Sequence, residues 1–371
     1  LLEFLSCIGD NFDSETLSAI MRITEKSAEN HIRALYMNDF VIRKEYGQFA
    51  ISHDKIQQAI YHQTADSKRV YMHLMIGSYL LEHAESTTKD TNIFAIVHHL
   101  NQGISRIEDE EERTKLARLN FRAGVQAKKE MAYPYAVEYL ELARDLFGTT
   151  TEETMIELQI QLAEAYALDA QYQKAIKNLV RTVDEAKDPL VKARVYEVWI
   201  KVLISKNEPG SAFDLADKAV ALLGIQYQTA ISNVELLRHV IWSIGITPES
   251  MERTVKQKQE LTDERLTLAF EIMYTVGGAA YYSNPRLFAV NLLKMLRLSY
   301  KYGINPGTLA GYAVLGLLSA SKGGISGTVT DVRIILQAAL KSNASGLIVA
   351  HNHPSGNPEP SHEDIQLTRR L

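Results

Sequence analysis

Two histidines and an aspartate near the C-terminal end of the sequence have the types and spacing of zinc ligands. His351 and His353 are two residues apart, and Asp364 follows eleven residues after the second histidine. Two imidazole nitrogens and one carboxylate oxygen leave a fourth tetrahedral position for water, which is typical of catalytic rather than structural zinc sites. Zinc in such a site lowers the pKa of its bound water toward about 7. The predicted chemistry is therefore hydrolysis.

The elements around these residues are expected to bring the three side chains together. The apolar run 347–350 is short and rich in β-branched residues, so it predicts a buried strand. Because side chains alternate along an extended chain, His351 and His353 then lie on the same face. Turn residues follow, and Ser361 is expected to cap a helix with Asp364 in its first turn. The turn can return that carboxylate to the imidazoles.

Residues 321–371 resemble the middle of the JAMM domain, also called MPN, of the RadC family. In JAMM metallopeptidases His-x-His is followed after seven residues by Ser and after two more by Asp, which matches His351, His353, Ser361 and Asp364. The resemblance implies Zn²⁺ as cofactor, the histidines and Asp364 as ligands, and a catalytic role for the Ser361 hydroxyl in oxyanion support. Taken alone, Ser361 fits a helix cap equally well, and Asp364 fits a first-turn partner of the helix dipole.

The general base of this family, a Glu on an upstream strand, has no counterpart in the chain. No acidic residue occurs between Glu271 and Asp331, and Asp331 follows the Gly-rich stretch 323–327 instead of preceding it. A carboxylate base must reach the attacking water within hydrogen-bond distance. Two functions therefore stay open: a JAMM-type zinc metallopeptidase-like protein whose helical repeats recruit a protein or peptide substrate, and a non-enzymatic interaction module with a residual metal site.

Composition predicts a globular protein without nucleic-acid or membrane partners. The chain has 371 residues, 46% of them hydrophobic, and a net charge of −5, which offers no electrostatic footprint for nucleic acid. The single cysteine, Cys7, excludes an internal disulfide and favours a reducing cytoplasm. Residues 1–9 are too short for a signal peptide and contain Glu3. The uncharged stretch 302–321 contains Pro306, so it is expected to form a buried helix rather than a membrane span.

Helical periodicity dominates the middle of the chain and repeats there. Apolar residues recur at intervals of three and four, and three segments align on Ala136, Ala175 and Ala212, which are 39 and 37 residues apart. Small residues allow close packing, so that each helix pair buries its face on the next. We expect tetratricopeptide (TPR)-like helical repeats over 121–318, after a helical connector over 76–120, and we expect the repeats to bind a protein or peptide.

Residues 1–75 have a different pattern. Two helical segments, 14–23 and 27–38, precede two short β-like runs that flank Gly47, and helix, helix, hairpin is the outline of a winged helix. Residues 1–70 carry eight Lys or Arg against ten Asp or Glu, a net charge of −2. This charge favours a packing or regulatory module over a DNA reader.

Residues 1–318 also resemble the region after the nucleotide-binding domain of large bacterial AAA-type signalling ATPases and kinases. The resemblance rests on the strings LLEFLSCIGDNFD, FAISHDKIQQAIY and IFAIVHHLNQG, and the chain contains no Walker A sequence. His98 and His99 in the last string are expected to be structural, because adjacent residues on a helix point in different directions. The predicted fold class is mostly α, a winged helix followed by TPR-like helical repeats, with a partial α/β JAMM domain over 319–371.

Overall fold

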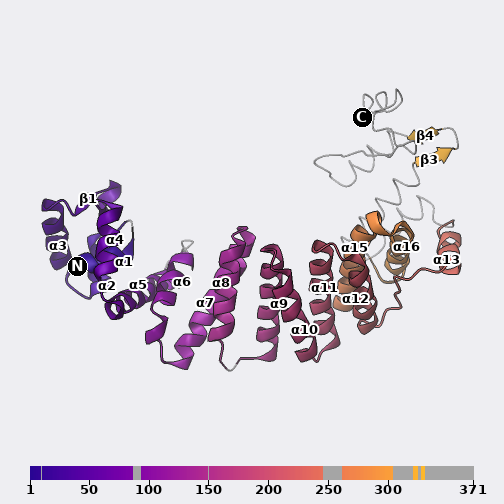
Figure 1. The fold of residues 1–371 in the computed structure, drawn as a ribbon, viewed down its shortest axis with the longest axis horizontal. Coiled ribbons are helices and arrows are strands. Elements are labelled where there is room, and N and C mark those ends of the chain that lie inside the picture. Colours follow the sequence, from indigo (N-terminus) through magenta and orange to yellow (C-terminus); the bar gives the residue numbers. More distant parts are fainter. Residues whose placement is uncertain are drawn as a thin grey trace. The chain divides into compact units, whose positions relative to one another are not determined.

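The computed structural model describes residues 1–9, 11–86, 93–148, 150–244, 261–303, 321–324 and 327–330. It contains two compact units, Leu1–Asn178 and Leu179–Leu371. Helices make up most of the described residues (Figure 1), so the predicted mostly α fold class is confirmed. In the described ranges no helix is both long and apolar enough to cross a membrane. Residues 304–320, most of the stretch expected to form a buried helix, lie outside these ranges.

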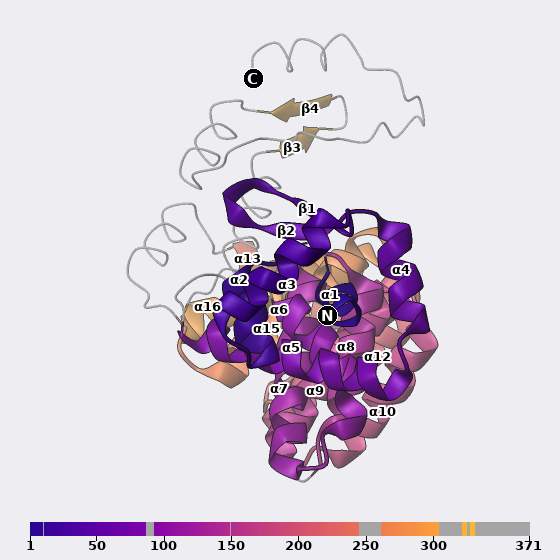
Figure 2. The same cartoon turned by 90° about the vertical axis from the view of Figure 1, so that its left-hand side faces the viewer.

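The chain begins with a module of short helices and one hairpin (Figure 2). Its elements are α1 (Leu2–Ile8), α2 (Ser14–Met21), α3 (Glu25–Met37), β1 (Val41–Arg43), β2 (Phe49–Ile51) and α4 (Asp54–Gln63). The two strands pair antiparallel, and a turn of 3-10 helix over Glu45–Gly47 lies between them. The order helix, helix, hairpin is the predicted one, and the identification of this module as a winged helix stays a prediction.

Local capping and one apolar cluster hold this module together. The Asp13 carboxylate accepts a hydrogen bond from the Thr16 N–H at 2.7 Å and so begins α2. Phe12 forms an antiparallel bridge with Phe49, with backbone N–O distances of 2.9 and 2.7 Å. Phe12 packs with Leu5, Leu17, Ala28, Ile32, Val41 and Ile51 in one buried cluster. The hairpin is therefore fixed to the helices by both backbone bonds and apolar burial.

Helix α5 (Asp66–Ser86) connects the module to the rest of the first unit. It packs against α1 and α2, where Ile76 joins a cluster with Phe4, Cys7 and Ile20. It also packs against α6 (Ile93–Gln102), which in turn packs on α7 (Glu110–Lys129). Asn101 of α6 and Asn120 of α7 exchange two amide hydrogen bonds, at 2.9 and 2.8 Å.

Pairs of packed helices follow in both units. The first unit contains α7 (Glu110–Lys129), α8 (Tyr133–Leu146), α9 (Glu152–Leu168) and the first half of α10 (Tyr172–Glu185). The second contains α11 (Pro189–Ser205), α12 (Pro209–Leu222), α13 (Asn233–Ile244), α15 (Glu264–Ser283) and α16 (Pro285–Tyr302). Helices α7 and α8, α11 and α12, and α15 and α16 pack as sequential neighbours. Several of these helices begin at a capping residue, such as Asp188, which precedes Pro189 at the start of α11.

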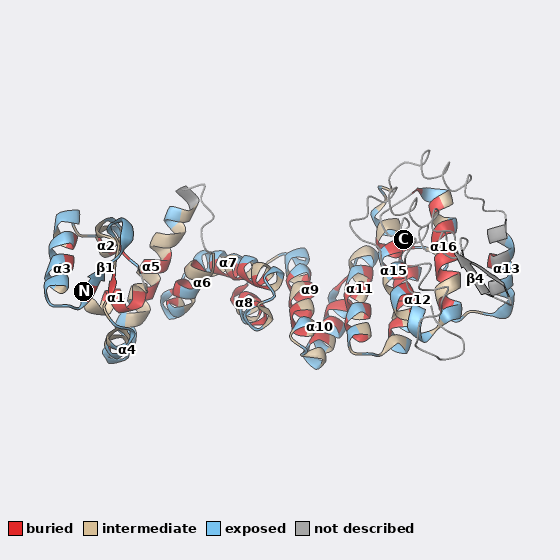
Figure 3. Cartoon of the chain, turned by 90° about the horizontal axis from the view of Figure 1, so that it is seen from above, coloured by how far each residue is buried: buried red, intermediate tan, exposed pale blue. Residues whose placement is uncertain are grey.

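Small residues lie where these helices meet, as the sequence predicted. Ala136, Ala175 and Ala212 are all fully buried. Gly124 of α7 faces Leu140 of α8 so closely that a Cβ atom added at Gly124 would lie 2.5 Å from the Leu140 Cγ. Buried residues line the helix faces that turn toward neighbouring helices (Figure 3). The repeats are therefore held by close helix packing rather than by long side chains alone.

A buried amide joins three segments of the second unit. The Asn291 side chain on α16 donates a hydrogen bond to the Met273 carbonyl of α15 at 2.6 Å and accepts one from the Tyr227 hydroxyl at 3.0 Å. Asn291 is 1% exposed, and its Nδ2 lies 2.9 Å from where a Cβ of Gly277 would be. Gly277 therefore lets α16 approach α15 closely enough for the amide to reach the backbone.

Near the C-terminal end the structure describes one further hairpin. Strand β3 (Ser321–Gly324) pairs antiparallel with β4 (Gly327–Thr330), with Ser321 opposite Thr330 and Gly324 opposite Gly327. These strands belong to the predicted segment 319–371. Its start at residue 319 stays a prediction, like the other predicted domain boundaries.

The Gly124 contact generates a stability prediction. We expect Gly124→Ala to lower the free energy of unfolding by about 1–3 kcal/mol, because Leu140 must move to admit the methyl group. Gly210→Ala is the matched control, since no atom lies within 4 Å of an added Cβ there. The control should be neutral or raise that free energy by up to about 1 kcal/mol. Urea unfolding followed by circular dichroism measures both changes, and equal effects of the two substitutions would contradict the packing argument.

Candidate functional site

The four predicted site residues lie outside the described residues. These are His351, His353, Ser361 and Asp364, and the structure therefore neither brings them together nor separates them. The hairpin β3–β4 is the described part of the segment that carries them. It begins 30 residues before His351 in the sequence, with Ser321. The placement of the zinc ligands stays a prediction from the sequence.

The donor set of this segment nevertheless fits zinc chemically. Imidazole nitrogens and carboxylate oxygens are both common zinc ligands, and three of them leave one position open. Cys7 is the only cysteine of the chain, so a closed thiolate site cannot form in this segment. The residues present are those of an open site of the catalytic type, and they do not make a cysteine-rich structural one.

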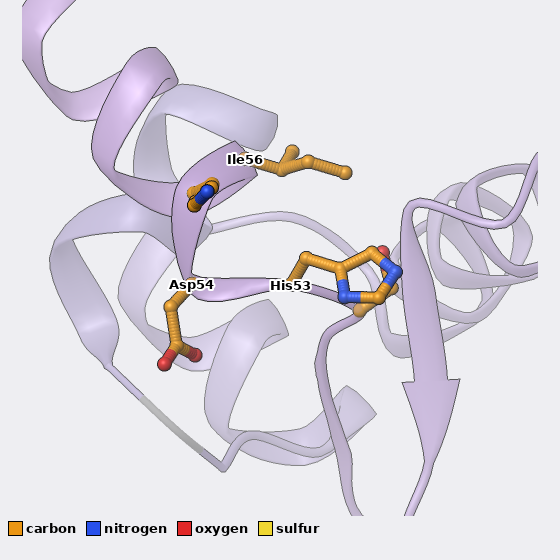
Figure 4. A pocket seen from close by; sticks show the side chains of 5 residues that line it. His53, Asp54 and Ile56 are labelled. Atoms are coloured by element: carbon orange, nitrogen blue, oxygen red, sulfur yellow. The ribbon is translucent and has the colours of Figure 1, made fainter.

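The described residues hold no second candidate metal centre. Within those ranges, no group of three or more His, Cys, Asp or Glu side chains could hold a metal ion. A surface hollow of about 510 Å³ is lined by Ser52, His53, Asp54, Lys55 and Ile56, at the start of α4. Its labelled His53 and Asp54 side chains point in different directions (Figure 4). This hollow therefore lacks converging groups of the kind that an acid–base or metal site needs.

A buried histidine pair is the most perturbed titratable cluster of the first unit. His73 of α5 and His99 of α6 are 3% and 6% exposed, and their Nδ1 atoms are 2.8 Å apart. The other ring nitrogen of His73 lies 3.1 Å from the Tyr61 hydroxyl. One histidine must donate and the other accept, so only one proton fits between the two Nδ1 atoms. The pair joins α5 to α6 as a neutral hydrogen-bonded unit.

Burial keeps both rings neutral. Desolvation, with smaller contributions from His98 and the Arg69 guanidinium, lowers the pKa of His73 from 6.5 to about 4. Desolvation and the two neighbouring histidines lower the pKa of His99 from 6.5 to about 3. Removing the charged form from water is unfavourable, which explains the direction of both shifts. A group with these properties is suited to packing rather than to proton transfer near neutral pH.

His99 has the structural role predicted for it, because it is buried and hydrogen-bonded to His73. His98 is exposed on the same helix, and its structural role stays a prediction. The sequence did not point to His73 as the partner, because it lies 26 residues before His99 and no local pattern links the two. An isolated histidine in a helical segment does not by itself indicate which distant residue it will contact.

The comparison with protein families assigns the C-terminal segment. Residues 311–371 match the family model described as a RadC-like JAB domain. This match contains all four predicted site residues. It confirms the resemblance inferred from the HNH motif, which is the sequence His351-Asn352-His353 with its flanking residues. It covers the last part of the chain only, and it does not extend over the helical repeats.

Curated relatives match the chain in part. A UPF0758 protein of Flavobacterium johnsoniae is 47% identical over 58 residues, which are 16% of this chain and 25% of that protein. A UPF0758 protein of Porphyromonas gingivalis is 48% identical over 58 residues, which are 16% of this chain and 26% of that protein. The chain thus spans about a quarter of the length of these two relatives. A UPF0758 protein of Clostridium novyi is 28% identical over 171 residues, with 38% of this chain and 75% of that protein covered.

One solved structure aligns with most of the chain. It is a Signal Transduction ATPase with Numerous Domains (STAND) protein with a tetratricopeptide repeat sensor from Pyrococcus horikoshii, covering 92% of this chain and 62% of its own. The identity is 14% and the TM-score 0.28, so the alignment does not establish a shared arrangement. The resemblance of residues 1–318 to signalling ATPases stays a prediction from the sequence.

The buried histidine pair generates a pH prediction. The unfolded chain binds protons at these histidines below pH about 6.5, whereas the folded pair binds them only near pH 4 and 3. The stabilising contribution of the neutral pair is therefore fully present above about pH 6.5 and decreases as the pH falls below that value. Between pH 7 and 5 we expect a loss of about 2 kcal/mol or less for each histidine.

Urea unfolding at pH 7 and pH 5 measures this loss. The double variant His73→Gln/His99→Gln should show a smaller difference between the two pH values than the parent chain. His98→Gln, which changes an exposed histidine of the same helix, is the control and should keep the full difference. An unaltered pH dependence in the double variant would show that other groups cause it.

Proposed function

We propose that the C-terminal segment binds zinc at a JAMM-type site, with His351, His353 and Asp364 as ligands. One observation carries the proposal: the HNH string, Ser361 and Asp364 occur at the JAMM spacing inside the stretch 311–371 that matches a RadC-like JAB domain. A zinc ion in such a site supplies Lewis-acid activation for the hydrolysis of a peptide or isopeptide bond. The Ser361 hydroxyl is proposed to donate a hydrogen bond to the oxyanion of the attacked carbonyl.

The proton acceptor of such a reaction is missing from this chain. Residues 272–330 contain no Asp or Glu, and a general base contributes typically 10²–10⁴-fold to rate. We therefore propose a metallopeptidase-like zinc site that binds the metal without efficient catalysis by this chain alone. The family resemblance implies both metal binding and hydrolysis, whereas we propose only metal binding for this chain.

The helical part is proposed to act as a protein-interaction module in the cytoplasm. Within each unit the paired helices carry exposed residues on one side, as α7 and α8 do in the first unit and α11 and α12 in the second. Helix-pair arrays use such extended surfaces to bind proteins and peptides. The net charge of −5 disfavours nucleic acid as the partner. Recruitment of a protein or peptide is the role that fits both the scaffold and a peptidase-like segment.

Zinc content tests the metal site. The full chain, freed of metal and then dialysed against zinc, should retain about one zinc ion per molecule by mass spectrometry of the metal. The double variant His351→Ala/His353→Ala should lose it, because two of three ligands are gone. His362→Ala, which changes a histidine at one of the two variable positions between Ser361 and Asp364, should keep the zinc. Equal zinc content in all three proteins would refute the ligand assignment.

Hydrolysis is tested separately with the zinc-loaded chain. We expect no chelator-sensitive cleavage of a peptide library or of isopeptide-linked substrates above the level of the His351→Ala/His353→Ala variant. The reason is the absence of a carboxylate base between Glu271 and Asp331. Cleavage that requires zinc and both histidines would show that another group of the chain accepts the proton.

A further inference from the structure

One face of α15 carries exposed tyrosines beside a carboxylate. Tyr274 and Tyr281 are each 56% exposed, Tyr282 is 87% exposed, and Glu271 is exposed one turn before Tyr274. Positions 271, 274, 278, 281 and 282 share one side of an α-helix, because at 3.6 residues per turn they fall within about 100° of one another around the axis. We call these five residues, with Gly278 at the centre, the tyrosine face. It extends for about 15 Å along the helix axis.

Among the described residues, no cation lies over a ring of the tyrosine face. Lys or Arg side chains lie 4.6–5.3 Å from the ring centres of five other tyrosines: Arg69 over Tyr61, Arg106 over Tyr71, Lys174 over Tyr166, Lys294 over Tyr227 and Lys301 over Tyr302. No described Lys or Arg lies over Tyr274, Tyr281 or Tyr282. Glu271 likewise has no ion pair with any described residue. The face offers ring surfaces and a carboxylate, both of which attract a cation.

The Tyr281 ring is held in place by its neighbours. It packs edge-on against Phe288 of α16, with centroids 5.2 Å apart, and against Tyr282 at 4.7 Å. A ring that is fixed by neighbours loses little further freedom when a ligand binds. Tyr281 is therefore already positioned for contact with a ligand.

Gly278 has no packing role within the described structure. Its neighbour Gly277 is required by the Asn291 amide, but no atom lies within 4 Å of a Cβ added at Gly278. A glycine in a helix interior is less favourable than alanine by about 1 kcal/mol. Gly278 leaves bare backbone between Tyr274 and Tyr281, where a second chain can approach the helix closely.

We propose that the tyrosine face binds an arginine-containing peptide segment of a partner protein. The proposal deepens the proposed interaction role of the helices and does not depend on zinc. Guanidinium groups would lie over Tyr274 and Tyr281, and one would pair with Glu271. About five residues of extended peptide span the 15 Å face, with their backbone passing Gly278.

Fluorescence anisotropy with a labelled short peptide, carrying Arg at every third position, tests the proposal. A peptide of the same length with Glu in place of Arg is the ligand control. The full chain, in the presence of a chelator, should bind the Arg peptide and not the Glu peptide. Tyr274→Ala/Tyr281→Ala should weaken binding about tenfold, from two lost cation–π contacts. Tyr135→Ala, which removes a 61% exposed tyrosine of α8, should leave binding unchanged.

The variant Gly278→Ala distinguishes a binding role of Gly278 from a purely structural one, because stability and binding should change in opposite directions. We expect this variant to raise the melting temperature, because alanine favours the helix, while it weakens binding of the Arg peptide. Failure of the Arg peptide to bind, equal binding of the Glu peptide, or equal affinities of the Tyr274→Ala/Tyr281→Ala and Tyr135→Ala variants would each overturn the proposal. The zinc measurement is independent, so failure of one proposal leaves the other standing.

Discussion

Close approach of neighbouring helices is the constraint on which the described structure depends. Helices can pack closely only where small residues remove side chains from the contact, as Gly124 does opposite Leu140. Ala136 and Ala212 are fully buried in the same way within their own units. When two helices approach this closely, the large side chains beside the contact bury apolar area, which stabilises the helix pair by about 25 cal/mol per Å². The repeated small residues therefore define where each helix meets the next.

Buried polar groups add specificity to this packing. The Asn101–Asn120 amide pair, the His73–His99 pair and Asn291 each connect different helices, and each finds its partners inside the protein. A buried polar group without a partner would cost about 1–3 kcal/mol, so alternative helix registers that separate these partners are disfavoured. Burial of the His73–His99 pair at the contact between α5 and α6 also lowers the pKa of both histidines.

Metal binding and protein recognition are proposed for different parts of the chain. The proposed zinc ligands belong to the segment that matches a RadC-like JAB domain, and none of the three lies in the described helices. The helices instead expose side chains, and the tyrosine face of α15 combines rings, a carboxylate and a glycine that costs helix stability. Functional surfaces commonly keep features that local stability alone would remove. The proposed cation-binding face and the proposed metal site can accordingly be disrupted one at a time.

The sequence by itself determined the helices, the small residues at their contacts and the donor set of the proposed zinc site. Each of these depends on local information, namely apolar periodicity and the spacing of His351 and His353. Only the tertiary structure decided that His73 meets His99 and that Tyr227 meets Asn291, 64 residues away. It also decided which tyrosines have a cation over the ring and which face solvent. Contacts between distant segments depend on how helices pack in space, and no short pattern in the sequence records that packing.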